Sequence, residues 1–242
     1  MRAKILALFL LAASPALAED TKQPCNLDAA AVIECNSGGR TFRVIREALS
    51  WTGRHAIAWA LVDPKDKDKI ETRDGEQFAS DANVDNALLH LPDGAVLKIL
   101  PGGHFGDAGR YNHQRHFAHW SELDQWLVVA NDSKWDTDDA GVYFIDGDGV
   151  SVMGPFDLLP FCTEAAHKFF ARGGKKFNWD NYSNSLGVKD VTLDGDVSLV
   201  FLMQVPKGEG KDDLLEADIV LHIKKVNDGL AATLTSIKRH PG

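Results

Sequence analysis

Residues 125–153, QWLVVANDSKWDTDDAGVYFIDGDGVSVM, decide the fold class of this chain. The runs 125–130 and 141–145 are short, apolar and rich in Val, Phe and Tyr, which predicts two buried strands. The sequence Asp146-Gly147-Asp148-Gly149 predicts a tight turn that leads into a third strand at 150–153. Successive strands joined by loops rich in Asp and Gly predict an antiparallel meander.

The same alternation of apolar runs and turn residues continues on both sides of this stretch. Upstream, Pro92-Asp93-Gly94 predicts a hairpin between two of the expected strands, and downstream Asp194-Gly195 and Asn227-Asp228-Gly229 predict further turns. The expected strands outside the deciding stretch are 54–62, 86–91, 95–100, 188–193, 196–204, 217–225 and 230–237. The fold class is therefore expected to be mainly β, built of antiparallel, blade-like and partly propeller-like meanders.

One short helix is expected between the two β regions, near residues 163–173. Thr163 is a suitable N-cap, and Gly173-Gly174 is a stop signal. All-β chains of this size are routinely single domains. We therefore expect one domain over 19–242, with blade-like units at about 48–102 and 103–156, the helix, and a C-terminal four-stranded meander over 188–238.

Two segments of the chain are similar to each other. SWTGRHAIAW begins at Ser50 and SELDQWLVVA begins at Ser121, and each has a Ser, a turn, a polar residue and then an apolar strand. Over about residues 48–153 this pattern resembles the repeats of TolB-like and WD40-like periplasmic β-propellers, although the Pro of their Ser-Pro-Asp-Gly turn is missing from both segments. The resemblance implies four-stranded blades with long insertions.

The N-terminus has the features of a secretory signal peptide over residues 1–18. Arg2 and Lys4 precede an apolar run, and Ala16-Leu17-Ala18 matches the small-x-small pattern after which signal peptidase cuts. We therefore expect a periplasmic protein that begins at Glu19, without membrane insertion. The formal net charge of −9 becomes −11 when the two basic residues of the leader are removed, so nucleic acid is not an expected partner.

Three cysteines are compatible with one disulfide in an oxidising compartment. Cys25 and Cys35 are the expected pair because the loop that they close is short, and Cys162 is then expected to be a buried free thiol. Pairing of Cys35 with Cys162 is the alternative, since connectivity does not follow from sequence.

Residues 101–120, PGGHFGDAGRYNHQRHFAHW, have the most unusual local composition of the chain. Imidazole nitrogen is a ligand for Zn²⁺ and Cu²⁺, so His113, His116 and His119 are weak candidates for a metal site. The alternatives are a loop that binds another kind of ligand and histidines that are merely solvated. The candidate binding residues of this segment are His104, Tyr111, His113, His116, His119 and Trp120.

The acidic stretch NDSKWDTDD at 131–139 suggests Ca²⁺, but Ala140 and Gly147 fall where an EF-hand loop requires oxygen ligands. A non-EF cation site and a solvated loop anchored by Trp135 are the two alternatives. Trp59 and Trp126 lie within apolar strands and are expected in the core. Any of the other four tryptophans could be exposed at a binding surface: Trp51, Trp120, Trp135 and Trp179.

The chain has none of the usual motifs for a catalytic nucleophile or a nucleotide phosphate. We therefore expect an exported, non-enzymatic protein without a cofactor, which binds a protein or a small ligand through the loops His104–Trp120 and Lys134–Asp139. A metal-assisted hydrolase that uses the His-rich segment is the first alternative, and Zn²⁺ and Ca²⁺ are the ions that the chain could bind. An envelope structural protein without a discrete site is the second.

Overall fold

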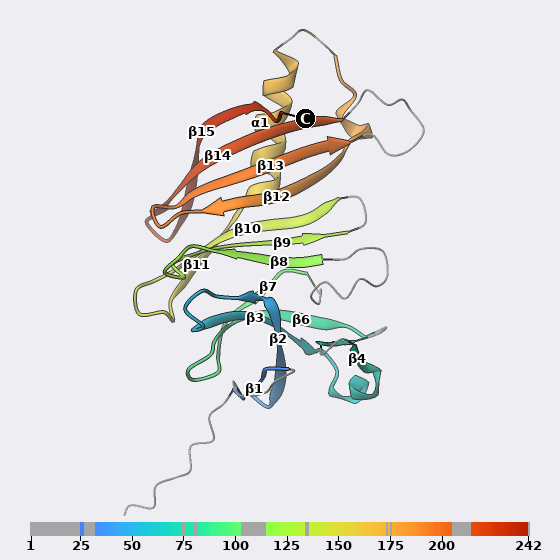
Figure 1. Ribbon diagram of the computed structural model, residues 1–242, viewed down its shortest axis with the longest axis vertical. Helices are drawn as coiled ribbons and strands as arrows, with labels where there is room; N and C mark the ends of the chain where they lie inside the picture. The colour runs from blue at the N-terminus through green and yellow to red at the C-terminus, as the bar shows by residue number, and fades with distance from the viewer. Residues whose placement is uncertain are drawn as a thin grey trace, which may run out of the picture.

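Three antiparallel sheets follow one another along the chain and are stacked along the long axis of the molecule (Figure 1). The computed structural model describes residues 25–26, 32–73, 76–79, 82–102, 115–133, 136–172, 174, 176–204 and 214–241. Within these residues one α-helix accompanies the sheets. The prediction of a mainly β fold of antiparallel meanders with one short helix is confirmed.

The first sheet has the order β1-β2-β3-β6-β7. Its strands are β1 (Glu34–Ser37), β2 (Arg40–Leu49), β3 (His55–Leu61), β6 (Val84–His90) and β7 (Ala95–Leu100). A 3-10 helix, η1 (Pro64–Lys69), and a two-stranded sheet of β4 (Ile70–Arg73) and β5 (Glu76–Ala79) are inserted between β3 and β6. The first sheet is therefore a four-stranded meander, β2-β3-β6-β7, with one additional edge strand.

The second and third sheets are each a four-stranded meander in simple sequence order. The second contains β8 (Arg115–Trp120), β9 (Trp126–Asp132), β10 (Thr137–Ile145) and β11 (Val152–Asp157). The helix α1 (Leu158–Ala171) and a 3-10 turn, η2 (Trp179–Asn181), then lead to the third. The third contains β12 (Ser183–Val191), β13 (Asp196–Gln204), β14 (Leu215–Val226) and β15 (Gly229–Arg239).

The second sheet is buried on both faces, which explains why its strands are continuous apolar runs. Alternate residues of a strand point to opposite faces. Trp126 and Val128 therefore pack against the third sheet and α1, whereas Leu127 and Val129 pack against the first sheet. A third cluster covers the other face of the first sheet and includes both cysteines of the disulfide.

Several expected element boundaries are wrong: β12 covers Ser183–Val191 rather than 188–193, and β11 covers Val152–Asp157 rather than 150–153. The helix begins at Leu158 rather than near Thr163, because Asp157 is the N-cap and its carboxylate accepts a hydrogen bond from the backbone N–H of Leu159. Pro160 is accommodated because it lies in the first turn, where a backbone N–H is not needed. Residues 115–120 of the His-rich segment form β8 instead of a loop.

The cysteine prediction is confirmed in both parts. Cys25 and Cys35 form a disulfide, and Cys162 is a buried free thiol on α1, so the alternative pairing of Cys35 with Cys162 is wrong. Burial raises the pKa of the Cys162 thiol to about 12, and the nearby Asp157 carboxylate adds to the shift. Among the described residues, no helix is long and apolar enough to cross a membrane.

One turn recurs in all three meanders, at positions 71 residues apart: it starts at Ser50, Ser121 and Thr192. In the second sheet the backbone N–H of Trp126 donates to Oγ of Ser121 at 3.0 Å, and the N–H of Ser121 donates to the Trp126 carbonyl at 2.9 Å. Ser50 with His55 and Thr192 with Asp196 make the same pair of bonds. The turn connects β2 to β3, β8 to β9 and β12 to β13, so it joins equivalent strands of each meander.

Candidate functional site

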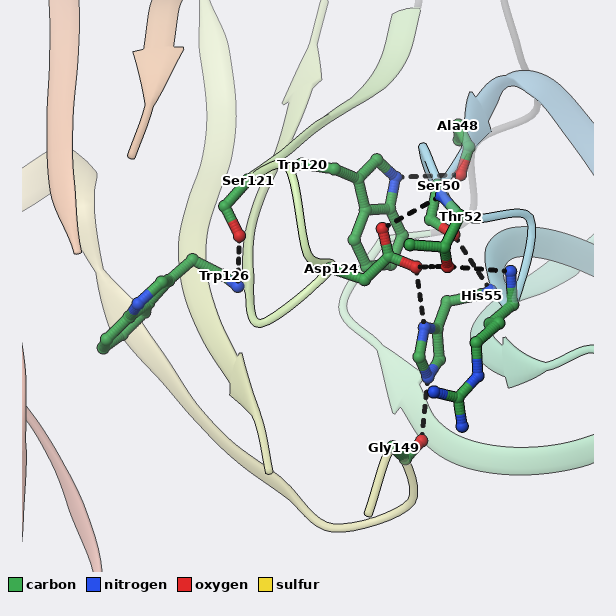
Figure 2. Close-up of polar contacts among 10 residues, drawn as sticks. Ala48, Ser50, Thr52, His55, Trp120, Ser121, Asp124, Trp126 and Gly149 are labelled. Atoms are coloured by element: carbon green, nitrogen blue, oxygen red, sulfur yellow. Dashed lines mark hydrogen bonds and ion pairs between the residues drawn. The ribbon is translucent and has the colours of Figure 1, made fainter. Parts of the chain in front are cut away.

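The recurrent turns bring polar groups of the first two sheets into contact. His55, the first residue of β3, places Nδ1 at 3.2 Å from Oδ2 of Asp124 and Nε2 at 2.8 Å from the carbonyl oxygen of Gly149. Thr52 Oγ1 donates to the same Asp124 carboxylate, as Figure 2 shows. His55 and Asp124 are each only 2% exposed, so this network is shielded from solvent.

The chemistry of this network is structural rather than catalytic. A carbonyl oxygen only accepts, so Nε2 of His55 is the donor to Gly149, and Nδ1 faces the Asp124 carboxylate. Both ring nitrogens are therefore occupied within the protein. A general base needs a free nitrogen within reach of a substrate, and His55 has none. The His55–Asp124 pair connects β3 to the turn between β8 and β9.

Two tryptophans lie next to this network, and the indole N–H of one donates to the backbone of the other. Trp120 is buried, with 7% of its surface exposed, and its Nε1 donates to the Ala48 carbonyl at 3.2 Å (Figure 2). Trp51 is 78% exposed, yet its Nε1 donates to the Trp120 carbonyl at 3.2 Å. The ring of Trp51 is therefore held in one orientation while most of its surface faces solvent.

Trp51 and Trp120 line a groove with a cavity volume of about 480 Å³, which we call the edge groove. It runs across one strand of each sheet, with Glu47 from β2, His119 from β8, Glu122 from the following turn, and Asp190 from β12. The volume is in the range of pockets that bind small molecules. The stacking of the three sheets thus creates a single surface feature to which all three contribute.

The edge groove is acidic. Glu47, Glu122 and Asp190 are exposed, and among the described residues none of the three is in an ion pair. Lys189 also lines the groove, but its Nζ lies 2.6 Å from Oδ1 of Asp218, so its ammonium is already in an ion pair. Burial lowers the pKa of His119 below its ordinary value, so its imidazole is neutral at pH 7.

The structure brings together two of the residues predicted from the sequence, His119 and Trp120, in the edge groove. Trp120 is buried, so the expectation that it could be exposed is wrong. His116 and His119 lie three positions apart on β8 and face opposite sides of the sheet, so their imidazoles do not converge. His116 is buried and its Nδ1 contacts Oδ1 of Asn131. His104, Tyr111, His113 and Trp135 lie outside the described residues.

Three of the four aspartates in the acidic stretch 131–139 accept hydrogen bonds within the protein. Asp136 accepts from the backbone N–H of Asn184 at 2.9 Å, Asp132 accepts from Thr137 at 2.6 Å, and Asp139 accepts from Asn131 at 2.7 Å. In the part of the chain that the structure describes, no group of three or more His, Cys, Asp or Glu side chains is arranged to hold a metal ion.

Sequence reasoning missed Glu47, Glu122, Lys189 and Asp190 as site residues, because they come from β2, the turn after β8 and β12 and are ordinary surface charges in sequence. The similarity between the Ser50 and Ser121 segments is the signal that could have found two of them, since Glu47 and Glu122 flank these turns. Comparisons with protein-family models, with curated proteins and with solved structures found no match for the chain.

Proposed function

We propose that this chain is an exported, non-enzymatic protein that binds a small ligand in the edge groove. The observation that supports binding is Trp51, whose indole is 78% exposed but fixed by its bond to the Trp120 carbonyl. Covering about 150 Å² of an aromatic ring is worth roughly 4 kcal/mol of transfer free energy. Because the ring is already oriented, a ligand that stacks on it loses little of this gain to ordering.

Export is supported by the leader-like N-terminus and by the Cys25–Cys35 disulfide, which is typical of oxidising compartments. We also propose that the three meanders are blade-like units related to propeller repeats. The recurrence of the hydroxyl-capped turn at Ser50, Ser121 and Thr192 supports that relationship.

Binding is favoured over catalysis because the most buried imidazole–carboxylate pair, His55 with Asp124, has no nitrogen left for a substrate. The metal-assisted hydrolase would need the His-rich segment to fold so that His113 joins one of the two described histidines. His116 and His119 do not supply two adjacent ligands, because they face opposite sides of β8.

The test is a ligand-observed NMR screen of neutral, anionic and cationic fragments against the wild type, Trp51→Ala and Val62→Ala. Val62 is also an exposed apolar residue, at 52%, but it lies outside the groove, which makes it the matched control. We expect fragments that bind the wild type and Val62→Ala but not Trp51→Ala. Absence of any binding fragment, or equal binding to Trp51→Ala, would overturn the proposal.

A further inference from the structure

The groove presents more negative than positive charge to a ligand. Glu47 lies on the first sheet, Glu122 in a turn of the second and Asp190 on the third, so the acidic residues of the lining come from three separate elements. Among the described lining residues Lys189 is the one permanent cation, and its ammonium is bound by Asp218. As far as the described residues go, a ligand in the groove therefore meets three carboxylates that are not in ion pairs.

The exposed face of Trp51 also favours a positively charged ligand. Its indole N–H is already donated to the Trp120 carbonyl, so the ring has no hydrogen to offer an anionic ligand. The part of the ring that is left for a ligand is the π face. This face carries the negative part of the ring quadrupole and attracts cations. Trp is the best of the aromatic residues for this interaction.

Other ligand chemistries fit the lining less well. A phosphate or carboxylate needs donors, and Ser50, which carries the one hydroxyl of the described lining, is only 4% exposed. A neutral sugar would satisfy some carboxylate oxygens through its hydroxyls but would leave the negative charge uncompensated. At about 480 Å³ the cavity holds a small molecule rather than a folded protein.

We infer that the ligand of the edge groove is a small organic cation whose ammonium group lies over the face of Trp51 and between the carboxylates of Glu47, Glu122 and Asp190. This inference rests on the proposed function, because it names the ligand class of the same groove. Quaternary and primary ammonium groups share the required chemistry, and the experiment separates them.

The decisive comparison uses choline and its uncharged isostere 3,3-dimethylbutan-1-ol, with ethanolamine as the primary ammonium probe, in calorimetric titrations of the full-length mature protein. Choline and 3,3-dimethylbutan-1-ol have nearly the same shape, so the difference between their affinities measures the effect of the charge alone. We expect choline or ethanolamine to bind at least about tenfold more tightly than the isostere. Binding of the charged probe should weaken as salt rises from about 0.05 to 0.5 M, because part of the attraction is screened.

Variants locate the binding site. Trp51→Ala should weaken binding of the preferred cation by about tenfold, while Trp51→Phe, which keeps a π face, should lose less. Glu122→Gln should weaken it by about three- to fivefold, and the exposed Asp68→Asn, outside the groove, should not change it. Circular dichroism melts of each variant establish that it is folded, and Glu122→Gln tests the inference even where Trp51→Ala does not fold.

The outcomes distinguish failure of the cation inference from failure of the proposed function. Equal binding of choline and its isostere, or Trp51-dependent binding of glutamate or glucose in preference to the cations, would overturn the cation inference and leave a ligand-binding groove. If neither these probes nor the fragment screen gives any Trp51-dependent binding, both the inference and the proposed function are wrong.

Discussion

His55 on β3 contacts Asp124 in the turn after β8, and Trp126 on β9 contacts Leu193 in the turn after β12. His55 lies five residues after Ser50, and Trp126 lies five residues after Ser121. Trp126 donates its indole N–H to the Leu193 carbonyl at 3.0 Å, whereas His55 uses Nδ1 toward the Asp124 carboxylate. Each sheet is thus connected to the next through one position of a repeated turn, with different chemistry at the two junctions.

The contribution of the Asp124 charge to the contact between the first and second sheets can be tested by Asp124→Asn. Asp124 has a φ of 59°, a conformation that Asn tolerates as well as Asp, so the substitution removes the charge without new backbone strain. We expect the free energy of unfolding to fall by about 2 kcal/mol, because His55 and Thr52 lose a charged hydrogen-bond acceptor. Urea denaturation followed by circular dichroism measures it.

Asp68→Asn is the matched control, because Asp68 is exposed and its loss should change the free energy of unfolding by no more than about 0.5 kcal/mol. Equal effects of the two substitutions would show that the His55–Asp124 contact contributes nothing specific.

Much of the fold was predictable because its signal is local. Apolar runs bounded by Asp-Gly turns predicted β9, β10, β13, β14 and β15 at nearly their observed positions. The strand β8 was missed because its sequence, RHFAHW, carries histidines on both faces, and only tertiary contacts accommodate them: His116 is buried against Asn131 and His119 lines the edge groove. The third copy of the turn was also missed, because Thr192 replaces Ser and the turn is one residue shorter.

The edge groove could not be predicted from local patterns, because its residues meet only through stacking of the sheets. Trp51 was one of four tryptophans that could have been exposed, and nothing in its neighbours distinguished it from Trp120. The difference arises from tertiary contacts: the Trp120 ring is covered and bonded to the Ala48 carbonyl, whereas the Trp51 ring is covered by nothing comparable among the described residues.

The contact between the second and third sheets requires a glycine at position 195. The substitution Gly195→Ala tests this requirement. A Cβ at this position would lie 2.4 Å from the Ile223 carbonyl oxygen and 2.9 Å from the Trp126 ring, and φ is 85°. We expect a loss of about 3 kcal/mol or more, because backbone strain and a steric clash act together. Gly38→Ala is the control: its φ is 57° but a Cβ would meet nothing within 4 Å, so about 1 kcal/mol is expected. Similar losses in the two variants would show that the third sheet does not pack closely here.

The Cys162 thiol should be unreactive in the folded protein. Its side chain is fully buried against the core of α1 and the third sheet, and burial raises its pKa to about 12, so almost no thiolate exists at pH 8. We expect iodoacetamide to leave the native protein unlabelled at Cys162 and to label it in denaturant. Peptide mapping without reduction should find Cys25 and Cys35 unlabelled in both conditions. Labelling of Cys162 in the native state at the denatured rate would contradict its burial.

Asp218 should make stability depend on pH at the acidic end. Lys189 and His240 donate to its Oδ1 and hold the pKa of this carboxyl below its ordinary value of 3.8, while Lys238 lies 3.8 Å from the other oxygen. A lowered pKa in the folded state means that the unfolded chain binds the proton more readily. The contribution of Asp218 is therefore complete above about pH 4 and is lost as the pH falls through the folded-state pKa.

We expect Asp218→Asn to be less stable than the wild type at pH 7, and the difference to shrink below pH 4, because a protonated Asp218 resembles Asn. Urea denaturation at pH 7, 5 and 3 measures the difference, with Asp68→Asn as a control whose small offset should not vary in this way. The same substitution frees Lys189, which also lines the edge groove, so it should weaken binding of an organic cation at pH 7. A stability difference that stays constant from pH 7 to 3 would show that the ion pairs of Asp218 do not stabilise the fold.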